Sequence, residues 1–141
     1  SQSLNDLRAI ARAVCQTYIR LRDVNQPCIS CSKTDAKWDA GHYFKAEIYT
    51  GLIFNEFNMH KQCSYCNCQL AGNLIEYRKG LVKRYGEDRV LALEALADLA
   101  RVYKFSRQEL IDIAILYRTK IKELQGFNNA GQGIDITITT K

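Results

Sequence analysis

Two Cys-x-x-Cys pairs constrain the fold of this chain more than any other feature. They are Cys28 with Cys31 and Cys63 with Cys66. The short turn within each pair lets both thiolates reach one ion, and two such turns complete the tetrahedron that structural Zn²⁺ prefers. The segment between the pairs is longer than the loop of a simple zinc ribbon, so it must itself fold as a hairpin. Cys68, or His60 in place of one thiolate, is an alternative ligand.

A disulfide framework is the other use that six cysteines could have. Against it, the sequence has no signal-peptide pattern and no apolar run long enough to span a membrane. Clustering as Cys-x-x-Cys pairs favours reduced, metal-binding thiols in a cytoplasmic protein. Cys15 stands apart from the pairs, and we interpret it as a small core residue of a helix.

The net charge of +5 has the sign expected of a protein that binds nucleic acid. Four cations crowd a short stretch beyond the second cysteine pair, and we expect them to contact DNA phosphates. They are Arg78, Lys79, Lys83 and Arg84. The cations farther along the chain are explained equally well as solvated helix faces.

The hydrophobic pattern predicts an α+β fold that is mainly α. Apolar residues at helical spacing follow Ser3, and Asp6 completes a capping box, which predicts a first helix over 4–23. Period-two alternation and a short apolar run predict a hairpin of strands 36–44 and 52–54. The remaining predicted elements are a short helix over 64–70 and helices over 73–85, 87–103 and 107–125, with capping boxes at Asn73 with Glu76 and at Ser106 with Glu109.

These elements divide the chain into four parts. They are an N-terminal helix (1–24), a zinc-bound core (25–86), C-terminal helices (87–125) and a flexible or β tail (126–141). In the core, two strands and a short helix between zinc knuckles make a ββα-metal unit.

A second, different metal site is predicted inside this core. Asp39, His42 and Asn67 supply a carboxylate, an imidazole and a carboxamide, which suit Mg²⁺ beside a general base. Each residue alone has an ordinary structural explanation, so the prediction depends on their combination. An ideal strand puts Asp39 and His42 on opposite faces, so this site requires Gly41 to supply a bend or a bulge.

The order His42, Asn58, Cys63-x-x-Cys66-Asn67 resembles the HNH, or His-Me finger, nucleases. Asn in the third position is similar to the phage junction resolvase endonuclease VII. The lambdoid phage recombination family called NinG or Rap resembles this chain more closely, over about residues 15–86. The similar segments are 18–23, 27–31, 38–43, 54–55, 58–60, 62–63, 66–67 and 72–74.

This resemblance implies a zinc-clamped HNH core and an endonuclease encoded by a phage or prophage. Zn²⁺ would be structural, and Mg²⁺ or Mn²⁺ would be catalytic, held by Asp39 and Asn67. His42 would act as general base, and Asn58 would fix the loop that orients the His42 ring. Endonuclease VII has a further acidic residue where this chain has Leu70, and the candidates to replace it are Glu47 and Glu76. His60 would either contact phosphate or be a buried, hydrogen-bonded histidine.

The implied substrate is branched DNA, such as Holliday junctions and D-loops. Paired nicks in a junction need two related sites, so we expect a homodimer, with the apolar helix 107–125 or the first helix at its interface. The alternative is that helix 87–103 or the tail covers the apolar excess of helix 107–125. Two other functions fit the zinc motif: a non-catalytic zinc module that binds nucleic acid, and a less selective HNH DNase.

Overall fold

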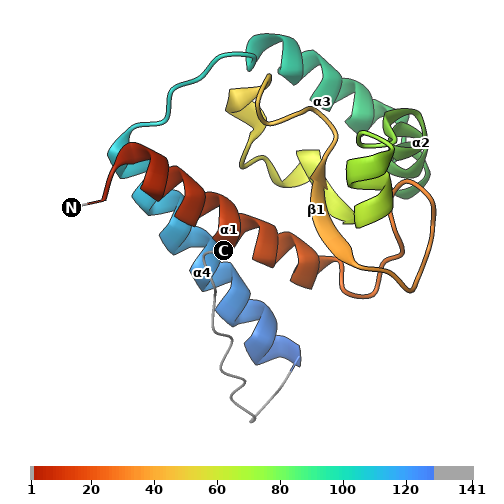
Figure 1. Ribbon diagram of the computed structural model, residues 1–141, viewed down its shortest axis with the longest axis horizontal. Helices are drawn as coiled ribbons and strands as arrows, with labels where there is room; N and C mark the ends of the chain where they lie inside the picture. The colour runs from red at the N-terminus through yellow and green to blue at the C-terminus, as the bar shows by residue number, and fades with distance from the viewer. Residues whose placement is uncertain (1, 129–141) are drawn as a thin grey trace. The chain divides into compact units, whose positions relative to one another are not determined.

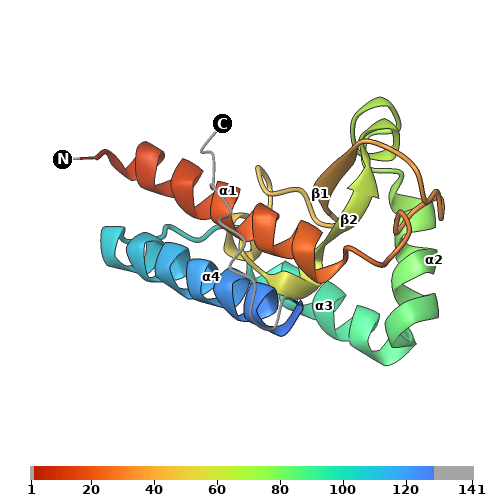
Figure 2. The same ribbon diagram turned by 90° about the horizontal axis from the view of Figure 1, so that it is seen from below.

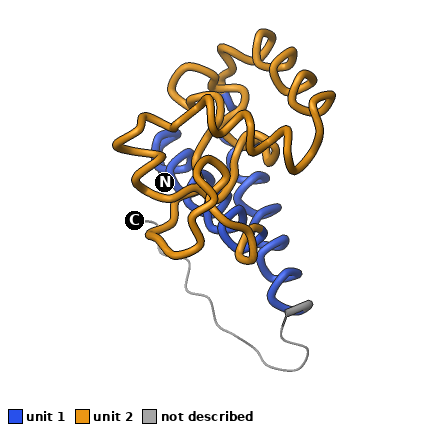
Figure 3. The backbone as a smooth tube through the Cα atoms, turned by 90° about the vertical axis from the view of Figure 1, so that its right-hand side faces the viewer, with its two compact units in different colours: residues 1–22, 105–141 blue, residues 23–104 orange. Residues whose placement is uncertain are grey.

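The computed structural model describes residues 2–128, and the chain forms two compact units (Figure 3). Unit 1 comprises Ser1–Arg22 and Phe105–Lys141, and unit 2 comprises Asp23–Lys104. Helix 87–103, assigned from the sequence to the C-terminal part, thus belongs to the same unit as the cysteines. The predicted tail begins inside the last helix, and its residues 129–141 lie outside the described residues.

Unit 1 is built on two helices, α1 (Leu4–Arg22) and α4 (Arg107–Asn128), which run side by side in the same direction (Figures 1 and 2). Arg107 donates to the carbonyl of Gln2 at one end, and the rings of Tyr18 and Tyr117 lie 5.4 Å apart farther along. Both helices predicted from these patterns are confirmed. No helix among the described residues is long and apolar enough to cross a membrane.

Reciprocal capping boxes begin both helices. The Asp6 N–H donates to Ser3 Oγ and the Ser3 N–H donates to Asp6 Oδ2, each at 3.1 Å. Ser106 and Glu109 repeat the arrangement at 2.9 and 3.1 Å. These bonds satisfy N–H groups that have no partner within a first helical turn, which explains why the predicted starts are accurate.

In unit 2, a two-stranded antiparallel hairpin carries the cysteine segment. β1 (Trp38–His42) pairs with β2 (Met59–Cys63), in a register that runs from Trp38 opposite Cys63 to His42 opposite Met59. The first predicted strand is confirmed and the second is wrong. Residues 52–54 are buried in the connecting loop, which contains the 3₁₀ turns η1 (Thr50–Leu52) and η2 (Glu56–Asn58). The apolar character of this segment reflects packing in the core, where Leu52 contacts Leu93 and Ala97.

The strand ladder also corrects the role assigned to Gly41. Pairing is continuous through Gly41 opposite His60, so β1 contains no bulge and Asp39 and His42 remain on opposite faces. A Cβ at residue 41 would lie 1.9 Å from Oε1 of Gln62. The absence of a Cβ at Gly41 lets the buried Gln62 side chain lie directly over its backbone.

Three helical segments follow β2: the π-helical turn η3 (Tyr65–Gln69), α2 (Leu74–Tyr85) and α3 (Glu87–Leu99). The helices predicted over 64–70, 73–85 and 87–103 are confirmed, although α3 ends four residues early. It ends because the Ala100 and Arg101 carbonyls accept bonds from the N–H groups of Gly51 and Thr50. The capping box predicted at Asn73 is wrong, because that residue has φ 43° and its side chain does not cap the helix.

Packing within unit 2 ties these helices to the first cysteine turn. Tyr77, Leu81 and Val90 are buried against Ile29, which follows Cys28. Gly80 allows this approach, since a Cβ there would lie 2.0 Å from the Ile29 carbonyl oxygen. The cysteine turn is thus held against the middle of α2.

Candidate metal centres

The four predicted thiols converge on one point. Cys28 and Cys31 lie in the loop between α1 and β1, Cys63 ends β2, and Cys66 lies in η3. Their sulfur atoms all lie within 4.8 Å of one another. Tetrahedral zinc with bonds of about 2.3 Å places its sulfurs about 3.8 Å apart, and the Sγ atoms of Cys31 and Cys63 are 3.8 Å apart. The cluster therefore fits a structural zinc ion.

Backbone and side-chain donors already point at these sulfurs. The Cys63 N–H donates to Cys28 Sγ at 3.3 Å, and the Cys66 N–H donates to Cys63 Sγ at 3.4 Å. Asn73 Nδ2 donates to Cys66 Sγ at 3.4 Å. Burial raises the pKa of Cys28, but backbone donors outweigh it and the net pKa is lowered. At Cys66 burial prevails and raises the pKa to about 12. Donors of this kind stabilise metal-bound thiolates.

The two alternative ligands lie outside this cluster. Cys68 is exposed and is not among the converging thiols. His60 is buried in β2, where Nδ1 lies 3.3 Å from the Tyr77 hydroxyl. Of the two interpretations left open for His60, burial with a hydrogen bond is the one that the structure supports.

A second pair of predicted ligands meets beside the thiol cluster. Asn67 follows Cys66 directly in η3, and its Nδ2 donates to Asp39 Oδ2 on β1 at 3.1 Å. Both side chains are half-buried. A carboxylate with a carboxamide is a donor set that Mg²⁺ accepts, because Mg²⁺ commonly takes few protein ligands and completes its shell with water and phosphate oxygens.

Asp39 belongs to no larger cluster of acidic side chains among residues 2–128. Within residues 2–128, the four cysteines are the only group of three or more Cys, His, Asp or Glu side chains close enough to share an ion. Leu70 is exposed, and the carboxylate of Glu76 accepts from Lys79 at 3.0 Å.

His42 ends β1 with its ring orientation fixed. Nε2 lies 3.0 Å from the carbonyl oxygen of Ile53. A carbonyl only accepts, so Nε2 must carry the proton, and Nδ1 is then the basic nitrogen of the neutral ring. His42 thus has the tautomer that a general base acting through Nδ1 requires.

Asn58 fixes the loop that supplies this carbonyl. The side chain is fully buried, and its Oδ1 accepts from the Phe44 N–H at 2.8 Å. Its Nδ2 donates to the carbonyls of Phe44 at 3.0 Å and Leu52 at 3.3 Å. Leu52 precedes Ile53, so Asn58 ties the loop to the chain just after His42.

The cations predicted to contact DNA occupy two kinds of environment. Arg78 binds Glu94 at 2.9 Å and Glu87 at 3.4 Å, and its hydrogen bond lowers the pKa of the Glu94 carboxyl. Arg84 donates to the Pro27 carbonyl at 2.8 Å. These two arginines have partners on other elements. Lys79 and Lys83 are exposed on α2, where Lys79 pairs with the exposed Glu76 of the preceding turn, and they remain the stronger candidates for phosphate contact.

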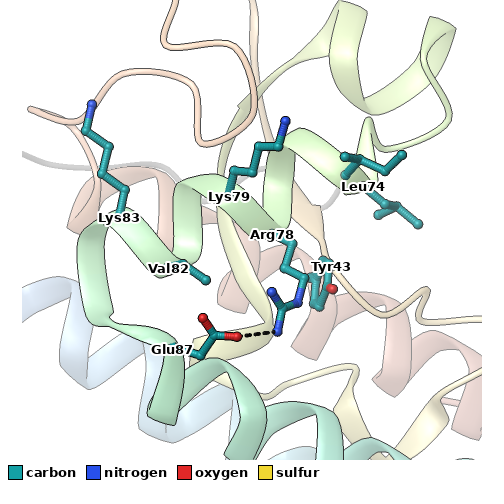
Figure 4. A pocket seen from close by; sticks show the side chains of 8 residues that line it. Tyr43, Leu74, Arg78, Lys79, Val82, Lys83 and Glu87 are labelled. Atoms are coloured by element: carbon teal, nitrogen blue, oxygen red, sulfur yellow. Dashed lines mark hydrogen bonds and ion pairs between the residues drawn. The ribbon is translucent and has the colours of Figure 1, made fainter.

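Figure 4 shows Lys79 and Lys83 extending from α2 above a groove, with Arg78 turned towards Glu87. The groove has a volume of about 580 Å³. Its lining combines apolar and charged side chains: Tyr43, Leu74, Ile75, Arg78, Lys79, Val82, Lys83 and Glu87.

Two buried residues support the site without having been predicted. Gln62 Nε2 donates to Ser30 Oγ at 2.9 Å and to the Gly72 carbonyl at 2.7 Å, which joins the first cysteine turn to the turn before α2. The Tyr77 hydroxyl donates to the Gly41 carbonyl at 2.7 Å. The sequence carries no local signal for either, because their partners are distant along the chain.

Comparison with protein families decides what this chain is related to. The family model for the "Bacteriophage Lambda NinG protein" matches residues 2–126. The chain belongs to the NinG family. The resemblance of the segments around the cysteines to NinG is thus confirmed, whereas the resemblance to HNH nucleases and endonuclease VII stays a prediction.

Individual NinG proteins align over most of the chain. Protein ninG of Escherichia phage lambda is 39% identical over 116 residues, which cover 82% of this chain and 55% of that protein. Protein ninG of Salmonella phage P22 is 37% identical over 116 residues, with 82% and 56% covered. The chain therefore spans about half the length of the curated relatives that it matches. No solved structure matches it.

Proposed function

We propose that this NinG-family chain carries a metal-dependent DNA endonuclease of the HNH, or His-Me finger, type. The observation that carries the proposal is the hydrogen bond between Asp39 and Asn67 beside the thiol cluster. Asp39 lies on β1, the short strand that ends at His42, whose ring is held by the Ile53 carbonyl. A protein that only binds nucleic acid has no need of oxygen ligands and an oriented imidazole. The substrates would be branched recombination intermediates, Holliday junctions and D-loops, in the bacterial cytoplasm.

Each residue has a distinct task in this reaction. Nδ1 of His42 would take the proton of the attacking water, while Nε2 stays bonded to the Ile53 carbonyl. Asn58 would hold the loop, so that the ring keeps this orientation. Asp39 and Asn67 would hold Mg²⁺ or Mn²⁺ through their side-chain oxygens. The bound metal would stabilise negative charge on the phosphate and on the departing oxygen.

The regular strand register restricts how DNA can bind. Asp39 and His42 lie on opposite faces of β1 and three residues apart, which is about 10 Å along a strand. A phosphate beside a metal at Asp39 would therefore have to extend past the edge of β1 to reach His42.

A panel of DNA structures tests the activity. With Mg²⁺ or Mn²⁺, a four-way junction and a D-loop should be cut faster than duplex or single strands, and chelation of the divalent ion should stop the cut. Asn67→Ala should need more Mg²⁺ for the same rate, because one ligand is lost. Equal cleavage of all structures would instead favour a less selective DNase. Binding without any cleavage would favour the non-catalytic zinc module.

Salt dependence tests the DNA path. Removing Lys79 and Lys83 together should lower the slope of log K against log salt by about two units, since each phosphate contact releases counterions. The control variant Arg118→Ala/Lys122→Ala makes the same charge change on exposed positions of α4 and should leave the slope unchanged. A slope altered only by the control pair would move the DNA path to unit 1.

A further inference from the structure

α3 is apolar on both sides, although only one side is covered. Val90, Leu93 and Ala97 are buried. The opposite face presents an exposed apolar stripe of five residues, Leu91, Ala92, Ala95, Leu96 and Leu99. Leu99 is 85% exposed, and Val102, just beyond the helix, is 83% exposed. Surface helices normally carry polar side chains on the outer face, so this face has the character of an interface.

The two ends of this stripe carry opposite net charges: Glu87, Asp88 and Arg89 at the start, and Asp98, Arg101 and Lys104 at the end. Glu87 and Asp88 occupy the first turn of α3. Asp88 precedes Leu91 by three residues and Ala95 by seven, which places it in line with the stripe. Beyond the last turn come Arg101, whose guanidinium lies 5.5 Å from the Tyr49 ring centroid, and the exposed Lys104.

We infer that this stripe binds the same stripe of a second copy, antiparallel about a two-fold axis at Ala95. In that arrangement Leu91 of each copy meets Leu99 of the other, and the alanines at the centre let the helices approach closely. The acidic first turn of one copy faces the basic end of the other. A parallel arrangement would instead set like charges against each other, so the charge pattern selects the antiparallel pair.

Another exposed apolar surface lacks this self-complementarity. Ile115 and Leu116 on α4, the helix expected from the sequence to form the dimer, are adjacent residues on a helix whose remaining apolar face is buried. One helix pair buries less than the roughly 800 Å² per partner of a standard interface. We therefore expect a dimer that dissociates at micromolar concentrations. The role of this dimer, to make two cuts in one junction, rests on the proposed nuclease function. The formation of the dimer does not depend on that function.

Sedimentation of the zinc-loaded chain without DNA tests the dimer. The parent chain should associate as its concentration rises to about 200 µM, and Leu99→Glu should remain monomeric. Leu116→Glu is the matched control on α4 and should still dimerise. A parent chain that is monomeric throughout, or a dimer broken by Leu116→Glu and not by Leu99→Glu, would overturn the inference.

Cysteine cross-linking tests the antiparallel register in a Cys68→Ser background. Ala95→Cys should form a disulfide between copies. Leu91→Cys alone should not, because the two positions would be about 12 Å apart along the axis at 1.5 Å per residue. A mixture of Leu91→Cys with Leu99→Cys should cross-link. A Leu91→Cys homodimer would indicate parallel helices and contradict the inference. Neither test involves cleavage, so failure here is separate from failure of the nuclease proposal.

Discussion

Replacing His42 with alanine should slow cleavage of branched DNA by about 10²–10⁴-fold, the usual loss when a general base is removed. Zinc content and DNA affinity should stay near those of the parent chain, because His42 lies outside the thiol cluster. Rates measured at saturating DNA, with zinc analysis of the same samples, check this result. Added imidazole should restore part of the rate.

His42→Gln separates the two tasks of the ring. A glutamine amide can still donate to the Ile53 carbonyl, but it cannot take a proton at neutral pH. If the ring acts as a base, His42→Gln should be as slow as His42→Ala while being more stable. If the ring only holds the loop, His42→Gln should cut nearly as fast as the parent, and the catalytic assignment would fail.

The pH dependence gives an independent readout. A general base works in its neutral form, so the parent rate should rise with pH as His42 loses its proton. This rise should be absent from both variants. The chain has only two histidines, and His60 is buried in β2. A rise that persists in His42→Ala would assign the base to another group.

Features encoded by local spacing were predictable from the sequence. The thiol cluster follows from two short turns, each of which fixes its own pair of ligands. The starts of α1 and α4 follow from Ser3 with Asp6 and Ser106 with Glu109, because each box forms its hydrogen bonds within one turn. The position of Asn67 was predictable for a similar reason, because it directly follows Cys66, which belongs to the thiol cluster.

The second strand was missed because tertiary partners determine it. Residues 59–63 include histidine, lysine and glutamine, yet all five are buried. Their polar groups are satisfied from a distance, as when the Lys61 N–H donates to Asp23 Oδ2 at 3.0 Å and Gln62 bonds to Ser30. A hydrophobic pattern detects apolar residues and not strand pairing. It therefore predicted a strand at the apolar residues 52–54, which are buried in a loop.

The ion-pair partners of individual charged residues could not be predicted from a local pattern either. Arg78 and Lys79 look alike in the sequence, but Glu94 approaches Arg78 from the next helix, and Lys79 stays exposed. Gly41 is a second example. A glycine in a strand is compatible with a bulge, but in the structure its missing Cβ makes room for the Gln62 side chain instead.

Removing zinc should unfold the hairpin of unit 2 as well as stop cleavage. The two strands have five residues each, and an isolated hairpin of this size is marginal in water. Around Cys28, Cys63 and Cys66, the apolar packing recorded among residues 2–128 comes from Ala36 and Trp38. Zinc binding in small metal-dependent domains is worth about 10–16 kcal/mol and is largely folding free energy.

Cys66→Ser and Cys68→Ser form a matched pair for this prediction. Both change one sulfur to oxygen in or beside the same turn, but only Cys66 belongs to the cluster. Cys66→Ser should lose zinc and lose protection of the β1 and β2 amides from hydrogen exchange, whereas Cys68→Ser should keep both. Zinc lost from Cys68→Ser would show that the ligand set is wrong. Strand amides that remain protected in zinc-free Cys66→Ser would mean that packing of Tyr77 and Leu81 on Ile29, rather than the metal, holds the hairpin.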